Sequence, residues 1–432
     1  MNGALGNVGL VVTMVGKLAQ LVRIIEKCGF AVVLFRCKNA GEIMKEIPWI
    51  QIAKDLQSEI VEQRRYLHSI PELGFKEEKT AAFVAKTLEQ YGYSVRRQVG
   101  TTGVVADFGA NPVVAIRAEM DGLPMHESTT SHYRSSHDGV SHSCGHDVNM
   151  ACALAAAKIL AAQGASAGGV RIIMQPAAEE SVDAEGKTGT FRMIEGGALD
   201  GVKSIIALHI DATMMPGMVG IITESAKVAA SNFKVEIKPA ATSREVPFDC
   251  IRAIATLLQS LFAGSSSTDS SDGTTIVNSI ETAPPGAQSI CQSATLRGSL
   301  NSLGKEARRE EMKRLDSACA TVLQAGGVYN LEYLDSESGG ELDADVTETM
   351  RQVACEVVGE KSVSVVKRKT WTEDYSALLK VTPGSMMLLG GQIRTSRRSH
   401  HSPSFDVDES ALYIGAAILA ATAYRLLGES KS

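Results

Sequence analysis

The chain has 432 residues, 44% of them hydrophobic, and a formal net charge of −6. That length suffices for two domains with a sizeable core, and the composition suits a soluble globular protein. The mild acidity, without any run of Lys and Arg interleaved with aromatic residues, argues against a nucleic-acid partner.

Residues 1–48 are predicted to be an N-terminal extension of uncertain role. Their apolar stretch is interrupted by Lys17, Arg23, Glu26 and Lys27, so it contains no run of about 18 apolar residues that would cross a membrane. Neither a basic start nor a small-residue cleavage site marks a signal peptide. We therefore expect no membrane partner.

Cysteines are scattered along the chain without the spacing of a disulfide framework. In a chain of this length they are expected to be mostly buried free thiols in a reducing compartment, which predicts a cytoplasmic protein. The eight cysteines stand at positions 28, 37, 144, 152, 250, 291, 319 and 355.

From about residue 50 the pattern becomes regular. Apolar residues recur at helical spacing up to about residue 70, and a second helix is predicted to end at Gly92. Further along, short strands alternate with helices, which predicts an α/β domain with a mainly parallel sheet. The predicted strands lie at 94–100, 103–109, 112–122, 170–176 and 204–210, and a helix rich in small residues lies at 146–163.

The order of the predicted strands and helices changes between 229 and 340. Strand, helix, strand, strand, helix and strand follow one another there, which is the ferredoxin-like βαββαβ order. We predict an inserted domain at 229–340. The main domain then consists of 49–228 and 341–432, and the second of these segments returns to helix, strand and helix.

Side chains of the kind that bind metals recur at predicted strand ends and in loops. They are Cys144, His146, the pair Glu179–Glu180, His209 and His401. Loops at the carboxyl ends of strands in an α/β sheet converge on one crevice, and thiolate, imidazole and carboxylate suit Zn²⁺. Two adjacent glutamates allow one to bind metal while the other takes a proton from water. Each motif alone is more often structural, so the joint placement carries the prediction.

Seven motifs in order now resemble a known family. RRYLHSIPELGF, AIRAEMDGLP, SCGHD, QPAAEES, ALHI, TEDYSALL and HSPSFDVDE look like those of the aminoacylase/carboxypeptidase superfamily of di-metal peptidases. The branch of hippurate hydrolases and plant auxin–amino-acid conjugate hydrolases looks closest, and the resemblance covers about 55–425. It implies a metallopeptidase catalytic domain, with the inserted domain acting as a lid through which two copies form a homodimer.

The resemblance also implies a role for each residue that matches a motif. Cys144 would bridge two metals as thiolate, and Glu179 would be the general base that acts on the metal-bound water and protonates the leaving amine. Asp121 would orient a ligand histidine. His146, Glu180, His209 and His401 would complete the two ligand sets.

The implied reaction is hydrolysis of a small-molecule amide, an N-acyl amino acid or similar conjugate, with two divalent metal ions as cofactors. Zn²⁺, Mn²⁺ and Co²⁺ all suit the mixed ligands, so the sequence does not select among them.

Other residues near these motifs have readings that stay open. Asp147 begins a predicted helix, so a role as N-cap or first-turn anion is as reasonable as one in orienting a ligand. We interpret His68 and Glu72 as structural residues of a turn. Four histidines in the preceding loop are interpreted as residues near the mouth of the cleft and not as ligands: His126, His132, His137 and His142.

The lid departs from the family pattern. KPAATSREVPFD lacks the histidine expected there, QSICQSA replaces an Asn-Val-Ile-Pro stretch, and Asn301 stands for an arginine. Nearer the metals, QPAAEE has an extra alanine and Asn149 replaces a frequent second histidine. Losing an oxyanion donor costs roughly a hundred- to a thousand-fold in turnover. Arg244 is either a cationic substitute or a solvated side chain.

These departures leave three functions open. The first is the amidohydrolase described above. The second is a dipeptidase or carboxypeptidase of the same superfamily, and the third is a catalytically weak or silent relative that keeps its metal.

Overall fold

The computed structural model describes residues 47–164, 168–179, 182–223, 228–240, 248–263, 273–283, 291, 293–333, 340–366, 373–394 and 398–429. At a few strand and helix ends only the backbone is described, and Asn301 is among them. The predictions for residues 1–46, for Glu180 and for Arg244 therefore fall outside the described residues.

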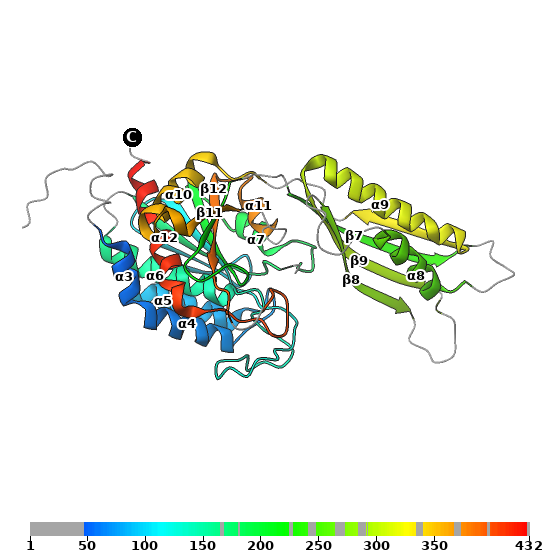
Figure 1. The fold of residues 1–432 in the computed structure, drawn as a ribbon, viewed down its shortest axis with the longest axis horizontal. Coiled ribbons are helices and arrows are strands. Elements are labelled where there is room, and N and C mark those ends of the chain that lie inside the picture. Colours follow the sequence, from blue (N-terminus) through cyan, green and yellow to red (C-terminus); the bar gives the residue numbers. More distant parts are fainter. Residues whose placement is uncertain are drawn as a thin grey trace, which may run out of the picture. The chain divides into compact units, whose positions relative to one another are not determined.

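An eight-stranded sheet forms the larger part of the fold (Figure 1). Its strand order is β1-β2-β4-β3-β5-β12-β6-β11. The strands are β1 (Ser94–Val99), β2 (Gly103–Phe108), β3 (Pro112–Glu119), β4 (Gly169–Gln175), β5 (Ser204–Asp211), β6 (Val219–Ile222), β11 (Val363–Val366) and β12 (Gly384–Gly390).

The prediction of a mainly parallel sheet was wrong for the flanks, because the sheet is mixed. The four central strands β4, β3, β5 and β12 run parallel to one another. The pairs β1–β2, β2–β4 and β12–β6 are antiparallel. β1 and β2 are joined by a short turn at Gly100–Thr102, and a connection that short can join only antiparallel strands. The parallel centre matters for the site, because it aligns the carboxyl ends of four strands.

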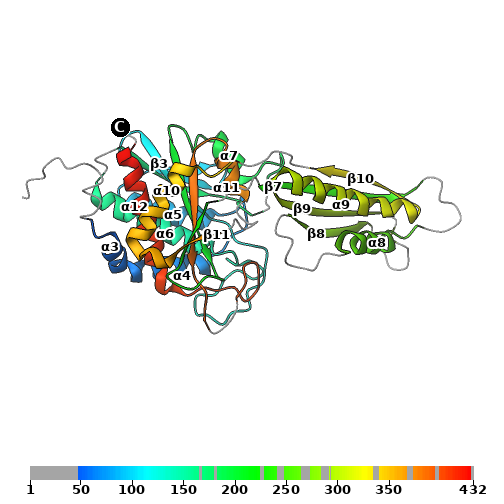
Figure 2. The same ribbon diagram turned by 45° about the horizontal axis from the view of Figure 1, so that its top comes forward.

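Helices cover both faces of this sheet (Figure 2). One face carries α3 (Trp49–Asp55), α4 (Gln57–Ser69), α5 (Glu78–Gln90), α6 (His146–Gln163), α10 (Ala344–Val358) and α12 (Leu412–Glu429). The other face carries α7 (Gly189–Glu195) and α11 (Glu373–Leu378), which pack with Val105, Ile173 and Leu388. The alanine-rich α6 lies directly against α12, because small side chains let two helix backbones approach closely.

The helix α12 is strongly apolar. The segment Glu409–Glu429 is long and apolar enough to cross a membrane, but 78% of its apolar window is buried inside the protein. It contacts α6, α10 and strands of the sheet. We therefore describe it as a core helix.

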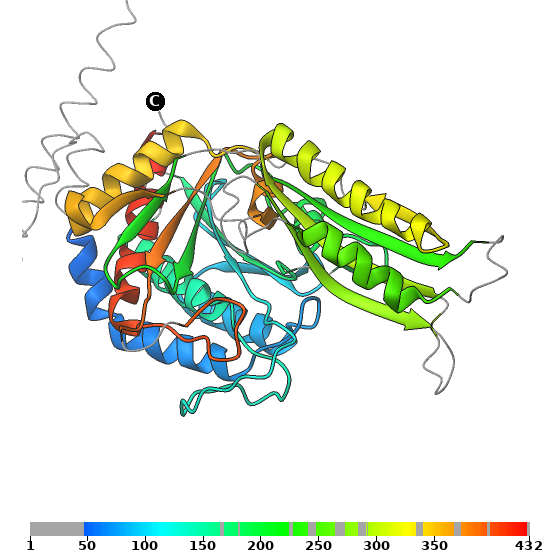
Figure 3. The same ribbon diagram turned by 45° about the vertical axis from the view of Figure 1, so that its right-hand side comes forward.

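A second sheet of four antiparallel strands has the order β10-β7-β9-β8. Figure 3 shows the two helices of this part, α8 and α9, on the same face of that sheet. The βαββαβ order predicted from the sequence is present: β7 (Val228–Pro239), α8 (Cys250–Phe262), β8 (Gly273–Ala283), β9 (Ser293–Leu303), α9 (Gly304–Gln324) and β10 (Gly327–Tyr333).

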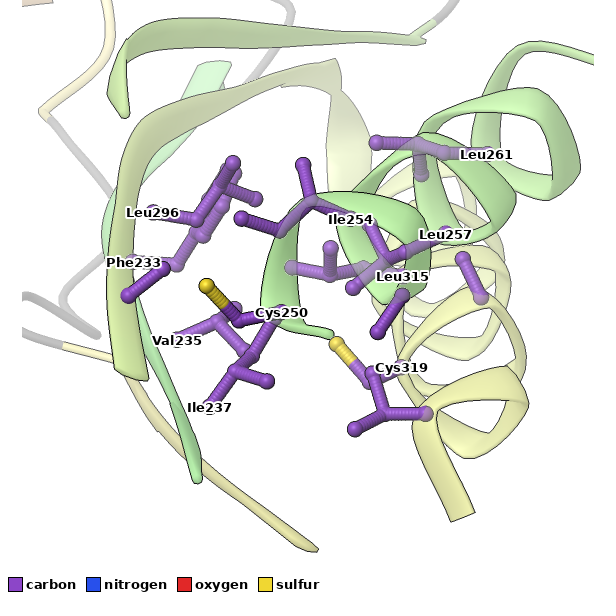
Figure 4. Close-up of a cluster of buried hydrophobic side chains, with 14 of the residues drawn as sticks. Phe233, Val235, Ile237, Cys250, Ile254, Leu257, Leu261, Leu296, Leu315 and Cys319 are labelled. Carbon is purple, nitrogen blue, oxygen red and sulfur yellow. The ribbon is translucent and has the colours of Figure 1, made fainter. Parts of the chain in front are cut away.

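This four-stranded sheet has a hydrophobic core of its own (Figure 4). Phe233, Val235 and Ile237 alternate along β7, so all three point to the helical face. They meet Leu257 of α8 and Leu315 of α9, all buried.

Cys250 and Cys291 form a disulfide in this part of the fold. The prediction of free thiols was wrong for these two residues. They are 41 positions apart, but the backbone N–H of Cys250 donates to the carbonyl of Cys291, which brings the start of α8 to the entry of β9. Spacing in a sequence cannot reveal such a tertiary contact. Cys144, Cys152 and Cys319 are buried free thiols, and Cys355 is a half-buried one.

Candidate metal centre

Described residues predicted for the site, ligands and catalytic residues alike, come together at the carboxyl ends of the central strands. Asp121 follows β3, Glu179 follows β4, His209 stands near the end of β5, and His401 follows β12. These strands are neighbours in the sheet, although the residues span 280 positions, from 121 to 401. The parallel alignment thus explains why side chains distant in sequence share one site.

Cys144 and His146 reach the same place from the start of α6. Gly145 between them is the N-cap residue and has φ 92°, a left-handed conformation that glycine adopts without steric cost. A Cβ atom at Gly145 would lie 2.3 Å from Cγ2 of Ile210. The glycine therefore lets the chain turn tightly against β5, with its two neighbours directed into the site.

Two groups of potential ligands share Cys144. Cys144, His146 and His209 form one group, Cys144, Glu179 and His401 form the other, and the donor atoms within each lie within 4.8 Å of one another. Cys144 Sγ is 3.5 Å from His209 Nε2 and 3.3 Å from His401 Nε2. Glu179 Oε1 is 3.3 Å from His401 Nε2 and 3.6 Å from His146 Nε2.

This arrangement fits two divalent ions bridged by a thiolate. Ligands bound at about 2.0–2.3 Å in a tetrahedral site lie roughly 3–4 Å from one another, which agrees with these separations. The donor set of sulfur, imidazole nitrogen and carboxylate oxygen suits Zn²⁺, Mn²⁺ or Co²⁺. A ligand role for Glu179 is thus geometrically as reasonable as its predicted role as base.

Neighbouring carbonyl and carboxylate oxygens determine the tautomers of two histidines. His146 Nδ1 is 2.8 Å from the backbone oxygen of Asp121 and 3.1 Å from its Oδ1, and His209 Nδ1 is 2.8 Å from the backbone oxygen of Ile210. Only acceptors surround these Nδ1 atoms in the contacts just given, so Nδ1 carries the proton. Each Nε2 lone pair is then directed toward the other donor atoms.

Burial and neighbouring charges shift the pKa values in the site strongly. Burial, with the charges of Glu179, Glu119 and Asp121, raises the pKa of the Cys144 thiol. Burial lowers the pKa of His209 to about 4. For His146, burial lowers the pKa, but the hydrogen bond and charge of Asp121 outweigh it and raise the pKa to about 10. A bound cation would favour the thiolate and neutral imidazoles.

Asp121 links two parts of the site. Its Oδ1 faces His146 Nδ1, and its Oδ2 accepts a hydrogen bond of 2.9 Å from the backbone N–H of Glu179. Burial raises the pKa of Glu179, but the hydrogen bond with His401 and the charge of His146 lower it to about 2. Asp121 thus contacts the ring of one predicted ligand and the backbone of the predicted base.

His400, the residue before His401, makes structural contacts that the sequence did not reveal. His400 Nε2 accepts from the backbone N–H of Ala212 at 3.1 Å, so Nδ1 donates to the carbonyl of Cys144 at 3.1 Å. Burial lowers the pKa of His400 to about 3, which keeps it neutral. His400 therefore holds the loop that carries His401 against the backbone of Cys144. The sequence did not indicate this structural role for His400.

Glu119 and Asn149 are two further residues that sequence reasoning did not place in the site. The Asn149 amide donates to Glu119 Oε2 at 3.0 Å and accepts from the backbone N–H of Ile210 at 3.1 Å. Arg117 pairs with the other oxygen of Glu119. Asn149, noted only as a departure from the family, thus connects α6 to β3 and to the residue after His209.

Asp147 has a structural partner on α4. Its Oδ2 accepts from Arg64 Nε at 2.8 Å and lies 2.8 Å from His68 Nδ1. Arg64 is fully buried and also pairs with Asp406 and Glu409, which are near His401 in sequence. The first-turn position predicted for Asp147 is confirmed, but the N-cap residue is Gly145.

The loop histidines differ in their exposure. His142 is 1% exposed, so its interpretation as a residue near the mouth of the cleft was wrong. His126 has a 74% exposed side chain and pairs with Asp138. Glu72 accepts from the backbone N–H groups of Lys79 and Thr80 at the start of α5, consistent with a structural residue of a turn.

Comparisons with known proteins relate the chain to a family of peptidases. A family model described as peptidase family M20/M25/M40 matches residues 115–425. N-acetyl-L-cysteine deacetylase of Bacillus subtilis is 29% identical over 87% of this chain and 90% of its own length. The IAA-amino acid hydrolase ILR1-like 2 of Arabidopsis thaliana is 29% identical over 90% of this chain and 93% of its own length.

Solved structures share the fold. One from methicillin-resistant Staphylococcus aureus has a TM-score of 0.71 at 26% identity and covers 88% of this chain and 99% of its own. The Bacillus subtilis YXEP protein, described as a dinuclear metal-binding peptidase of family M20, has a TM-score of 0.65 at 24% identity. It covers 87% of this chain and 99% of its own.

Proposed function

The chain belongs to peptidase family M20/M25/M40, and we propose that it hydrolyses the amide bond of N-acyl amino acids or similar conjugates. The relatives named deacetylase, amidohydrolase and IAA-amino acid hydrolase make it a metal-dependent amidohydrolase, an enzyme that acts on carbon–nitrogen bonds. The observation that supports the proposed site is the pair of ligand groups sharing Cys144.

In the proposed site Cys144, His146, Glu180, His209 and His401 would hold two divalent ions, with Cys144 shared between the two ligand sets. Two bound cations would polarise the amide carbonyl and lower the pKa of a water molecule, so that hydrolysis proceeds near neutral pH.

The residues of the chain perform the proton transfers in this proposal. Glu179 takes a proton from the attacking water on Oε1 or Oε2 and delivers it to the leaving nitrogen. Asp121 holds the His146 ring by Oδ1 and the backbone of Glu179 by Oδ2. One carboxylate therefore fixes the position of the proposed ligand relative to the proposed base. Asp121 is buried and the Glu179 side chain is 20% exposed, which favours this task, because fixed charges act more strongly where water is largely excluded.

The proposal also assigns a role to the four-stranded sheet and its two helices. We assign 229–340 as a lid and dimerisation domain inserted between 49–228 and 341–432. Its ferredoxin-like element order and separate core support that assignment. The altered lid motifs bear on substrate choice, and a dipeptide substrate is the second candidate because a thermostable carboxypeptidase of Saccharolobus solfataricus is 28% identical over 84% of this chain.

The decisive experiment replaces each glutamate of the pair separately. Turnover is measured on a panel of N-acetyl and N-benzoyl amino acids and dipeptides, and bound metal is counted by mass spectrometry, with Zn²⁺, Mn²⁺ or Co²⁺ supplied. We expect Glu179→Gln to abolish turnover with both ions retained and Glu180→Gln to release one ion.

Other outcomes of the same experiment are equally informative. Loss of one ion from Glu179→Gln would make Glu179 a ligand, as its contacts with Cys144 and His401 allow. Full activity of Glu179→Gln would remove it from catalysis altogether. Metal bound by the wild type without turnover of any panel member would favour the silent relative.

A further inference from the structure

A strained turn carries the predicted base. Ala177 lies two residues before Glu179 and has φ 46°, a left-handed conformation that non-glycine residues rarely adopt. It is 2% exposed, and its backbone N–H donates to Glu77 Oε1 at 2.7 Å. A backbone held in such a conformation persists only where its surroundings enforce it.

Glu77 is the residue that meets this turn from the other side. It is fully buried, at 0% exposure, and it precedes α5, but its side chain makes no capping bond to that helix. Its second oxygen accepts from Thr102 Oγ1 at 2.5 Å. Burial raises the pKa of Glu77 to about 7, with a contribution from the charge of Asp121. Burying a carboxylate is costly unless its oxygens accept hydrogen bonds. One oxygen of Glu77 accepts from Thr102, just before β2, and the other accepts from Ala177 in the turn.

Close backbone packing encloses the turn further. A Cβ at Gly189 would lie 1.8 Å from the carbonyl oxygen of Pro176, and a Cβ at Gly103 would lie 2.9 Å from Cδ of Pro176. The next anchored amide is that of Glu179, which donates to Asp121 Oδ2 at 2.9 Å. Two buried carboxylates, Glu77 and Asp121, thus hold alternate amides of one short segment.

We propose that Glu77 is a positioning residue, which holds the Ala177 amide and thereby fixes where the Glu179 carboxylate stands beside Cys144 and His401. The proposal rests on the proposed function for its catalytic meaning. Displacing a catalytic group by about 1 Å can cost roughly a hundredfold in rate, so a single backbone hydrogen bond near the base has a measurable effect.

The test compares two substitutions of Glu77 with the same two substitutions of Glu72. Glu77→Gln keeps an oxygen that can accept from Ala177, whereas Glu77→Met has a similar length and no strong acceptor. Glu72 is the matched control, because its carboxylate also accepts hydrogen bonds from two backbone N–H groups. Those groups belong to Lys79 and Thr80 at the start of α5 and not to the turn that carries Glu179. The measurements are kcat and KM on the best panel substrate, bound zinc, and amide hydrogen exchange of residues 174–179.

We expect Glu77→Met to lower kcat by about ten- to a hundredfold with a nearly unchanged KM, and to speed amide exchange in 174–179. Glu77→Gln should stay within roughly threefold of wild-type kcat, because one acceptor remains. Both Glu72 variants should keep wild-type kcat and exchange in that segment. Wild-type kcat and wild-type exchange in Glu77→Met would overturn the proposal.

Two further arms keep the test decisive. If Glu77→Met does not fold, Ala177→Gly is added, because glycine adopts the left-handed conformation without help. Recovery of folding and of part of kcat supports the proposal, and no recovery contradicts it. If the wild type hydrolyses nothing on the panel, the proposed function fails, but the exchange measurement still decides whether Glu77 holds the turn.

Discussion

At the residue scale, Gly145 shows why the two ligands of the SCGHD motif are separated by a glycine. Its left-handed φ of 92° turns the chain from Cys144 into α6, and its missing side chain leaves room for Ile210. Ile210 follows the predicted ligand His209 on β5. A side chain at this position would therefore push the turn that carries Cys144 and His146 away from β5.

We expect Gly145→Ala to destabilise the protein by about 2–5 kcal/mol, from about 1–2 for the left-handed backbone and about 1–3 for overpacking. It should also weaken zinc binding. The matched control is Gly164→Ala at the other end of α6, where φ is also positive at 76° but no atom lies within 4 Å of a Cβ. Urea unfolding and chelator competition measure both effects, and unchanged zinc affinity in Gly145→Ala would contradict the argument.

At the element scale, a polar contact joins three helices on one face of the sheet. Glu59 of α4 accepts from Lys158 Nζ of α6 at 2.5 Å and from the Tyr91 hydroxyl, just after α5, at 2.7 Å. Burial raises the pKa of Glu59, but these two partners outweigh it and lower the pKa. The site depends on this face, since α6 carries Cys144 and His146 at its start.

We expect Glu59→Gln to cost up to about 1 kcal/mol at pH 7, because the pair is about one-third exposed and screened by solvent. A lowered pKa in the folded state means that the stabilisation exists above the unfolded value of about 4.3 and is lost as pH falls through the folded value. The difference from wild type should therefore be smaller at an acidic pH below the unfolded value than at pH 7. Glu62→Gln, an exposed carboxylate of the same helix, serves as the control in urea unfolding at both pH values.

At the scale of the whole molecule, the edge of the four-stranded sheet is the surface on which the proposed homodimer would form. β8 pairs only with β9, so its other side is an open edge among the described strands. Ile276 and Ile280 on this strand are 42% and 44% exposed. Apolar side chains on an open edge favour pairing with a second chain.

We expect the wild type to sediment as a dimer at micromolar concentration and Ile280→Lys to shift it toward monomer, because a charge on the edge opposes pairing. Val365→Lys is the control, since Val365 is 65% exposed on β11, the edge strand of the other sheet. A monomeric wild type, or an unaffected dimer in Ile280→Lys, would move the interface elsewhere or remove it.

Local patterns in the sequence determined most elements and suggested the candidate residues of the site. A run of small, mostly apolar residues predicted a helix at 146–163, and α6 spans His146–Gln163. The strands β6 and β11 were missed, because four-residue strands are too short to show a period. The joint placement of thiol, imidazole and carboxylate groups at strand ends and in loops predicted a metal site, and the family resemblance implied the ligand roles of Cys144, His146, Glu180, His209 and His401.

Only the tertiary structure decided the features that depend on contacts between distant segments. The contact of Glu77 with Ala177 spans 100 positions, and the disulfide of Cys250 with Cys291 spans 41. The structural contacts of His400 and the ligand-like position of Glu179 likewise come from packing of loops onto strand ends. A sequence shows which chemical groups are present and their local periodicity, but the distances between them are set only when the sheet aligns its strands.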